Sequence, residues 1–227
     1  FLFFISVNNN IIFNLQNDRF SMVKVADKLR HSSDDLTHFA RTYVETADIL
    51  YKNQYFDTLN IRSGQKERPL NYDKIYWDLN NEVRQKRHPD EKKVSLKELM
   101  AAMPYSKKEL HLLTLSEKNS NGLVALEVEA FNAMDGVFKD GNGNYTVRKE
   151  ANHLLASELL TSEQYRNAKE KIMLPIDDFL HSLIDRTKKA ASLQNKLIGS
   201  AFLKIFIFLG CGILILIYTT FFIRKRV

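Results

Sequence analysis

Two carboxylates and a hydroxyl follow the apolar face of one predicted helix, between residues 106 and 134. Glu117, Ser120 and Glu127 recur at helical spacing among leucines and a phenylalanine. A buried carboxylate is costly unless it is paired, so these side chains predict a polar pocket inside a helical bundle. Alternatively, the buried face is rotated by one position, and three apolar residues face inward instead: Leu123, Leu126 and Ala130.

Two arginines are the predicted partners of this pocket. Arg41 and Arg62 each carry a planar fork of donors that suits a carboxylate, whether that of Glu127 or that of a small anionic ligand. Arg41 lies off the main apolar face of its predicted helix. The alternative for Arg41 is therefore an ordinary surface arginine, unless short helices cover that face.

A third candidate is a pair of aromatic residues beside an acid, Tyr76-Trp77-Asp78. Aromatic side chains line many ligand pockets, where an OH, an NH or a carboxylate fixes the orientation of the ligand. The competing interpretation is that Trp77, the single tryptophan of the chain, anchors a short helical cap to the bundle through its buried area alone.

One loop has part of the spacing of a calcium site. Asp140, Asn142 and Asn144 match the first, third and fifth positions of an EF-hand loop, but Tyr145 replaces the glycine at position six and Ala151 replaces the glutamate at position twelve. A loop that lacks both residues predicts a turn rather than a calcium site.

Neither the histidines nor the single cysteine favours a metal site. The six histidines form no pair at ligand spacing, and Cys211 lies inside an apolar run. The sequence contains no nucleophile elbow, zinc-protease, phosphate-loop or dinucleotide-binding motif. We therefore expect no metal, no cofactor and no catalytic residue in this part of the protein.

The composition favours long helices over a β-sandwich. The 227 residues include only 8 Gly and 4 Pro, with 44% hydrophobic and 26% charged residues. The net charge of +6 is spread along the chain, and no basic stripe alternates with aromatic residues. This pattern argues against a nucleic-acid partner.

Periodicity and capping signals predict an all-α fold. A seven-residue apolar repeat indicates one long helix over 8–50, and Gly64 is expected to end a second helix over 51–62. Capping boxes at Ser95 and Ser106 each begin a further helix. The remaining expected elements are helices over 73–83, over 150–160 and from 161 onward, and loops over 86–93 and 135–145. Together they predict an elongated, four-helix-bundle-like ectodomain with short capping helices that continues into a C-terminal transmembrane helix.

The end of the chain has the pattern of a membrane span. Residues 205–223 carry no charge, and at about 1.5 Å per residue they extend roughly 28 Å, close to the thickness of a hydrocarbon core. The basic run Arg224-Lys225-Arg226 follows directly, which is typical of the cytoplasmic side. We therefore expect a transmembrane helix over 200–223 and a cytoplasmic region from 224–227.

Most of the chain before this helix is then expected to be extracytoplasmic. Residues 17–199 are predicted to form the folded domain, and residues 1–16 are interpreted as the end of a truncated first transmembrane helix and the start of that domain. The apolar residues 1–7 are alternatively the remnant of a signal peptide. The predicted location is a bacterial inner membrane, with the C-terminus in the cytoplasm.

Pro175 lies inside the last predicted helix. Proline removes a backbone N–H and crowds the preceding turn, so it kinks or interrupts a helix. In a bundle that transmits movement, we expect this position to act as a transmission hinge. The alternative is that a separate helix starts at Pro175.

Four stretches resemble a known class of domain: SDDLTHFARTYVETAD (33–48), YFDTLNIRSG (55–64), YDKIYWDL (72–79) and SEKNSNGLVALEVEAFNAM (116–134). They are similar to helical extracytoplasmic sensor regions of bacterial two-transmembrane receptors, which precede a histidine kinase, cyclase, phosphatase or chemotaxis module. The resemblance covers about residues 33–175. It implies that six residues belong to the motif positions of this class, for packing or binding: Arg41, Tyr43, Arg62, Tyr76, Trp77 and Asp78.

The function expected from these observations is signal sensing in a two-component or related system. A small ligand or a periplasmic partner protein would bind the ectodomain of a homodimer, and the last helix would pass the signal to a cytoplasmic output module. The alternative is a membrane-anchored helical adaptor that presents its bundle to a partner and signals nothing.

Overall fold

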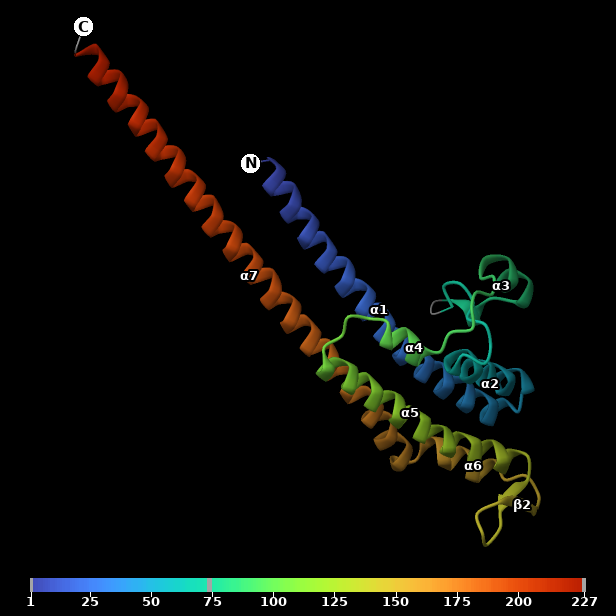
Figure 1. Ribbon diagram of the computed structural model, residues 1–227. Helices are drawn as coiled ribbons and strands as arrows, with labels where there is room; N and C mark the ends of the chain where they lie inside the picture. Colours follow the sequence, from blue (N-terminus) through green and yellow to red (C-terminus); the bar gives the residue numbers. More distant parts are fainter. Residues whose placement is uncertain (1, 73–74, 226–227) are drawn as a thin grey trace. The chain divides into compact units, whose positions relative to one another are not determined.

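The computed structural model describes residues 2–72 and 75–225, and these residues are mainly α-helical. The predicted all-α class is confirmed. The helices are α1 (Leu2–Thr46), α2 (Ile49–Ser63), α3 (Asn81–Arg87), α4 (Leu96–Ala101), α5 (Lys107–Met134), α6 (His153–Thr161) and α7 (Glu163–Arg224). A 3-10 turn η1 (Tyr76–Asp78) and two short strands, β1 (Val137–Lys139) and β2 (Tyr145–Arg148), complete the described elements (Figure 1).

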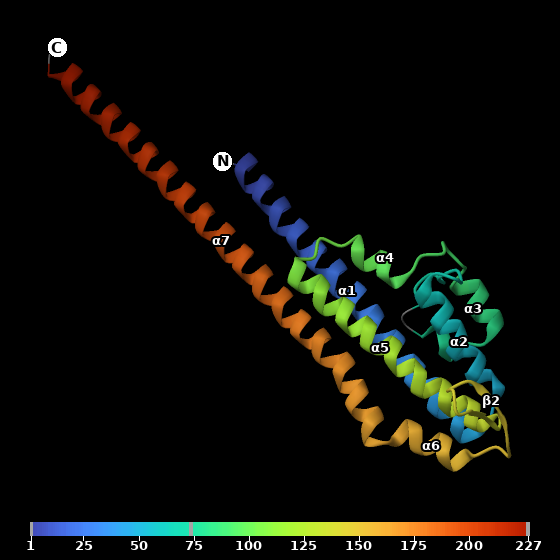
Figure 2. The same cartoon turned by 60° about the horizontal axis from the view of Figure 1, so that its bottom comes forward.

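Two compact units make up the chain. The bundle unit comprises residues 20–182, and the second unit comprises residues 1–19 together with 183–227. The core of the bundle unit draws buried side chains from α1, α2, α5, α6 and the beginning of α7. The segment with η1 and α3 lies next to α2 in both views of the ribbon (Figures 1 and 2).

The apolar repeat of the first helix is largely buried, but the helix ends four residues earlier than expected. Met22, Leu29, Leu36 and Tyr43 are each at most 6% exposed. The helix predicted to reach Leu50 ends at Thr46, because Ala47 adopts a left-handed conformation with φ of 55°. Asp48 then accepts a hydrogen bond from the Leu50 backbone N–H and caps α2.

The predicted capping residues are confirmed. Gly64 ends α2 in the left-handed conformation, with φ of 78°, and a Cβ there would lie 2.8 Å from the backbone nitrogen of Ser95. Ser95 and Ser106 both form complete capping boxes, with Glu98 and Glu109 reaching back to the N-cap backbone. These local side-chain bonds set the starts of α4 and α5.

Three predicted segments differ from the structure. The helix expected over 73–83 is replaced by η1 and α3, and its expected start at Asp73 lies outside the described residues. The charged loop expected from Lys86 begins later, because α3 continues through Arg87. The loop expected over 135–145 contains β1 and ends in the first residue of β2, which pair as an antiparallel hairpin.

The buried face of α5 combines both of the alternatives drawn from the sequence. Ser120 and Glu127 are buried, at 2% and 1% exposure, as the polar-pocket hypothesis requires. Leu123 and Ala130 are buried as well, whereas Leu110 is exposed and Glu117 is partly exposed. The face is therefore wide, and it carries polar and apolar residues together.

In the second unit, the end of α7 is long and apolar enough to cross a membrane, and its side chains are exposed. Leu209, Ile213 and Leu216, for example, are each more than half exposed. Arg224 is the last residue of α7, and Arg226 of the predicted basic cluster lies outside the described residues. Exposed aliphatic side chains over this length fit a lipid environment.

Candidate functional site

The carboxylate of Glu127 lies in the core of the bundle unit between two tyrosines. The Tyr55 hydroxyl of α2 donates to Glu127 Oε2 at 2.7 Å, and the Tyr165 hydroxyl of α7 donates to Oε1 at 2.7 Å. Tyr55 and Tyr165 are themselves fully buried. One side chain of α5 therefore joins three helices through short hydrogen bonds in a site without solvent.

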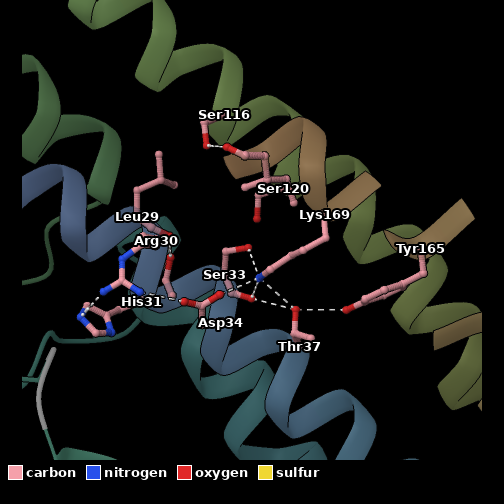
Figure 3. Close-up of polar contacts among 12 residues, drawn as sticks. Leu29, Arg30, His31, Ser33, Asp34, Thr37, Ser116, Ser120, Tyr165 and Lys169 are labelled. Carbon is pink, nitrogen blue, oxygen red and sulfur yellow. Dashed lines mark hydrogen bonds and ion pairs between the residues drawn. The ribbon is translucent and has the colours of Figure 1, made fainter. Parts of the chain in front are cut away.

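Lys169 connects the same region to α1 (Figure 3). Its Nζ forms an ion pair with Asp34 at 2.9 Å and donates to the carbonyl of Ser33 at 2.8 Å and to Thr37 Oγ1 at 3.1 Å. The Tyr165 hydroxyl lies 3.1 Å from the same Thr37 oxygen. The chain of contacts runs from Asp34 through Lys169 and Thr37 to Tyr165, Glu127 and Tyr55; we call it the polar core.

Burial shifts the ionisation of the polar core. It raises the pKa of Glu127 above the usual range of a carboxyl group, although the hydrogen bonds from both tyrosines and the charge of Lys169 act in the opposite direction. Burial lowers the pKa of Lys169, against the effect of Asp34. The two tyrosines have raised pKa values through burial and the neighbouring Glu127, so both remain hydroxyl donors at neutral pH.

Arg62 occupies a second buried position on α2 and does not hydrogen-bond Glu127, so the first of its two predicted partners is wrong, and the contact with a small anionic ligand stays a prediction. Arg62 is 5% exposed. Its guanidinium donates to Ser120 Oγ at 2.7 Å and to the Glu117 carbonyl and Asn121 Oδ1 at 3.2 Å each. The reason is helix register. Tyr55 faces Glu127, so seven residues later Arg62 faces Ser120, as expected for antiparallel helices.

Two further predicted positions, Arg41 and Tyr43, lie elsewhere in the bundle unit. Arg41 donates twice to the carbonyl of Leu160, at 3.2 and 3.0 Å, and its guanidinium lies over the Tyr165 ring at 5.1 Å. It therefore satisfies the C-terminal end of α6 rather than a carboxylate. Tyr43 donates to Asp135, and burial, followed by Asp135, raises its pKa to about 12.

Tyr76, Trp77 and Asp78 stand together in η1. Trp77 packs edge-on against Phe39 of α1 with ring centroids 5.3 Å apart, and the Arg84 guanidinium lies 5.2 Å from the centre of its ring. Trp77 and Asp78 line a cleft of about 470 Å³ between α1, α2 and the segment from η1 to α3. Tyr76 lines a separate cleft of about 470 Å³ on the other side of Arg84.

The predicted residues therefore form several small groups instead of one pocket. Arg62 and Ser120 are in contact, Trp77 and Asp78 share a cleft, and Glu127 lies between tyrosines. Sequence reasoning missed several residues that the structure places at these sites: Asp34, Thr37, Gln54, Tyr55, Arg84, Tyr165 and Lys169. Tyr55 and Lys169 did occupy apolar-face positions of their helices, but nothing in the sequence connected them to Glu127.

Comparisons with known proteins add no assignment. Neither the family models nor the curated proteins nor the solved structures contain a match to this chain. The site must therefore be interpreted from its own geometry.

The Asp140 turn uses the carboxylate internally. Asp140 accepts the backbone N–H groups of Asn142 and Asn144 at 2.9 and 3.0 Å and the Thr146 hydroxyl at 2.8 Å. These bonds hold its pKa below the ordinary value. Within the described part of the chain, no group of three acidic, histidine or cysteine side chains is placed to hold a metal ion.

Pro175 lies inside α7, and two side chains of α5 compensate for it. Proline cannot donate to the carbonyl four residues earlier, that of Lys171. Asn119 Nδ2 donates to that carbonyl at 2.7 Å, and Ser116 Oγ donates to the carbonyl of Ile172 at 2.8 Å. The helix therefore continues through the proline, and the alternative of a separate helix starting there is wrong.

A double-mutant cycle tests this compensation. We expect Asn119→Ala to cost about 1 kcal/mol of unfolding free energy when Pro175 is present, because the Lys171 carbonyl loses its donor. In a Pro175→Ala background the same change should cost almost nothing, because the new backbone N–H bonds that carbonyl. Chemical denaturation of the four proteins measures the coupling, and equal costs in both backgrounds would refute it.

Proposed function

We propose that this chain is the sensing part of a membrane-bound bacterial signal transducer. In this proposal residues 17–199 form an extracytoplasmic domain that binds a ligand or a partner protein. The end of α7 crosses the inner membrane, and Arg224 and Lys225 lie at the cytoplasmic side. The output module is attached on that side, and the described residues have no catalytic role.

One observation carries the proposal more than any other. A single helix, α7, begins in the core of the bundle unit, where Tyr165 and Ile172 are fully buried, and includes the apolar segment that can span a membrane. A helix that is packed at one end and membrane-compatible at the other can pass a change of packing through a bilayer. A simple membrane anchor would not need one uninterrupted helix from the core of the bundle unit into the apolar segment.

The polar core supplies the kind of element that such a sensor needs. Its hydrogen bonds and ion pair join α1, α2, α5 and α7 with defined partners, so they favour one register of these helices over others. Ligand binding that prefers a second register would have to exchange these partners. We propose that this exchange, with Pro175 as the hinge, separates two discrete states of the domain.

Insertions in α7 test the transmission step. Two residues added after Ala191 turn the following helix by about 200°, whereas seven residues turn it by about 700°, within about 20° of two full turns. We expect the two-residue insertion to abolish or lock the response of the full-length transducer and the seven-residue insertion to preserve it. Equal responses of both proteins would contradict transmission through helix phase.

The second candidate function is a membrane-anchored adaptor with no output. The polar side chains of the polar core bond to one another, which favours the adaptor. A bundle that does not change state needs only such stabilising contacts. The coding sequence beyond Val227 separates the two functions. A kinase, cyclase, phosphatase or methyl-accepting module in that reading frame supports the sensor, and a stop codon directly after Val227 refutes it.

A further inference from the structure

The cleft beside Trp77 contains a buried polar side chain that has no hydrogen-bond partner among the described residues. Gln54 of α2 lines this cleft and is only 6% exposed. Among the described residues its side-chain amide makes no hydrogen bond, although a buried amide normally has one. The amide faces the cleft and is open to a ligand, and among the described residues Trp77 Nε1 of the same cleft is a buried donor without a hydrogen-bond partner.

Three charged side chains line the same cleft: Asp35, Asp78 and Arg84. No ion pair joins Asp78 to Arg84 or links either of these two to another described residue. Arg84 is nevertheless held in place, because its Nε donates to the Leu79 carbonyl at 2.6 Å and its guanidinium lies over the rings of Tyr76 and Trp77. Its terminal nitrogens donate to no described residue, so their N–H groups are available to donate two hydrogen bonds to a carboxylate.

Part of the remaining wall is apolar, and Asp35, His38 and Asn80 add polar groups to it. Phe39, Leu50 and Trp77 contribute to the apolar part, and Phe39 and Trp77 are fixed by their edge-to-face contact. Such a wall suits an aliphatic or aromatic side chain, while the polar groups fix the orientation of the ligand. The cleft volume of about 470 Å³ exceeds the size of a single amino acid.

We propose that this cleft binds a free α-amino acid with an apolar side chain. Its carboxylate would pair with Arg84, its ammonium with Asp78, and Gln54 would hydrogen-bond one of the two groups. The Arg84 side chain donates to the carbonyl of Leu79, the residue after Asp78, so the guanidinium and the Asp78 carboxylate lie in the same part of the cleft. The carboxylate and the ammonium of an α-amino acid are also close together. This inference rests on the proposed sensor function and names the class of its signal.

The neighbouring cleft does not fit this ligand as well. Several of its polar groups are already engaged within the protein: Lys66 pairs with Asp57 at 2.8 Å, and His88 Nδ1 lies 2.7 Å from the Leu70 carbonyl. A ligand there would have to displace existing contacts. The cleft beside Trp77 offers unpaired groups instead.

Calorimetry on the whole chain in lipid nanodiscs tests the proposal. The probes are L-leucine, L-isoleucine, L-phenylalanine and L-tryptophan, each compared with its amide and its N-acetyl derivative. We expect saturable binding of at least one amino acid and at least a tenfold loss of affinity for both derivatives, which each lack one charge. No binding of any of the four, or equal binding of the derivatives, would overturn the proposal.

Matched variants locate the site. Gln54→Leu and Asp78→Asn should each weaken binding about tenfold or more, whereas Gln164→Leu and Asp178→Asn, exposed residues outside the cleft, should leave affinity within about twofold. Asp78 is exposed, so its variant is expected to fold even if Gln54→Leu does not. Unchanged affinity in a folded Asp78→Asn protein would overturn the assignment.

The failures of the two proposals are distinguishable. If no amino acid binds but the reading frame continues into an output module and the α7 insertions change its response, the ligand class is wrong and the sensor function stands. If an amino acid binds but translation stops after Val227, the ligand site stands and the transducer is refuted.

Discussion

Glu127→Ala is expected to lower the free energy of unfolding by about 3 kcal/mol, or the thermal midpoint by about 8 °C. The change removes the common acceptor of the Tyr55 and Tyr165 hydroxyls, so Tyr55 loses its partner and Tyr165 keeps only the longer contact with Thr37 at 3.1 Å. It also opens a cavity in a region where the surrounding side chains are fully buried. Thermal and chemical denaturation of the detergent-solubilised chain, followed by circular dichroism, measures the loss.

Glu129→Ala is the matched control on the same helix. The Glu129 carboxylate pairs with Lys139 at the surface, where an ion pair contributes little, so we expect a change below about 0.5 kcal/mol. If both alanine variants lose the same stability, the effect comes from the α5 helix in general. The polar core would then not be a special source of stability.

Glu127→Gln separates the charge of Glu127 from its hydrogen bonds. Because the folded-state pKa of Glu127 is raised, the folded protein binds more protons there than the unfolded chain, and its stability falls as pH rises through that raised pKa. The amide does not titrate, so the stability of Glu127→Gln relative to the wild type should increase from acid to neutral pH. A difference that stays constant over this range would contradict the raised pKa.

The sequence predicted those features that depend on neighbouring residues. The capping boxes at Ser95 and Ser106 and the cap at Gly64 each rest on contacts within a few residues, and all three are present in the structure. The burial of Ser120 and Glu127 followed from helical periodicity. These signals are local, so the chain alone determines them.

Partners across the bundle depend on helix register, which the sequence did not specify. Tyr55 instead of Arg62 meets Glu127 because α2 and α5 are antiparallel with a particular offset, and an offset of two turns exchanges one for the other. The end of α1 at Thr46 was missed because Ala47, which favours helix, adopts a left-handed conformation there. This conformation separates α1 from α2, and the helix propensity of Ala47 alone does not predict it.

The hairpin, in contrast, had a signal that was overlooked. Val137-Phe138-Lys139 and Tyr145-Thr146-Val147 are rich in strand-forming residues, and they flank a Gly/Asn turn. Our interpretation of residues 135–145 as a loop used only the Gly, Asn and Asp residues of the turn and neglected the strand-forming residues on either side of it. The same segment explains the second large effect expected from a single substitution.

Gly136→Ala is expected to cost about 3 kcal/mol. Gly136 has φ of 67°, a conformation that costs an alanine about 1–2 kcal/mol, and a Cβ would lie 2.3 Å from the Lys149 carbonyl oxygen. That oxygen belongs to backbone held by the Lys149 N–H donating to the Gly136 carbonyl at 2.9 Å. The clash therefore cannot be relieved by a side-chain movement, and the connection from α5 through the hairpin must shift.

Gly143→Ala separates the clash from the backbone strain. Gly143 has φ of 85°, but a Cβ there meets no atom within 4 Å, so this variant bears only the conformational cost of about 1 kcal/mol. The difference between the two variants then measures the steric part, which we expect to be about 2 kcal/mol by chemical denaturation. Equal losses would mean that the backbone at Gly136 shifts at little cost to accommodate the Cβ. The hairpin would then not fix the connection between α5 and α6.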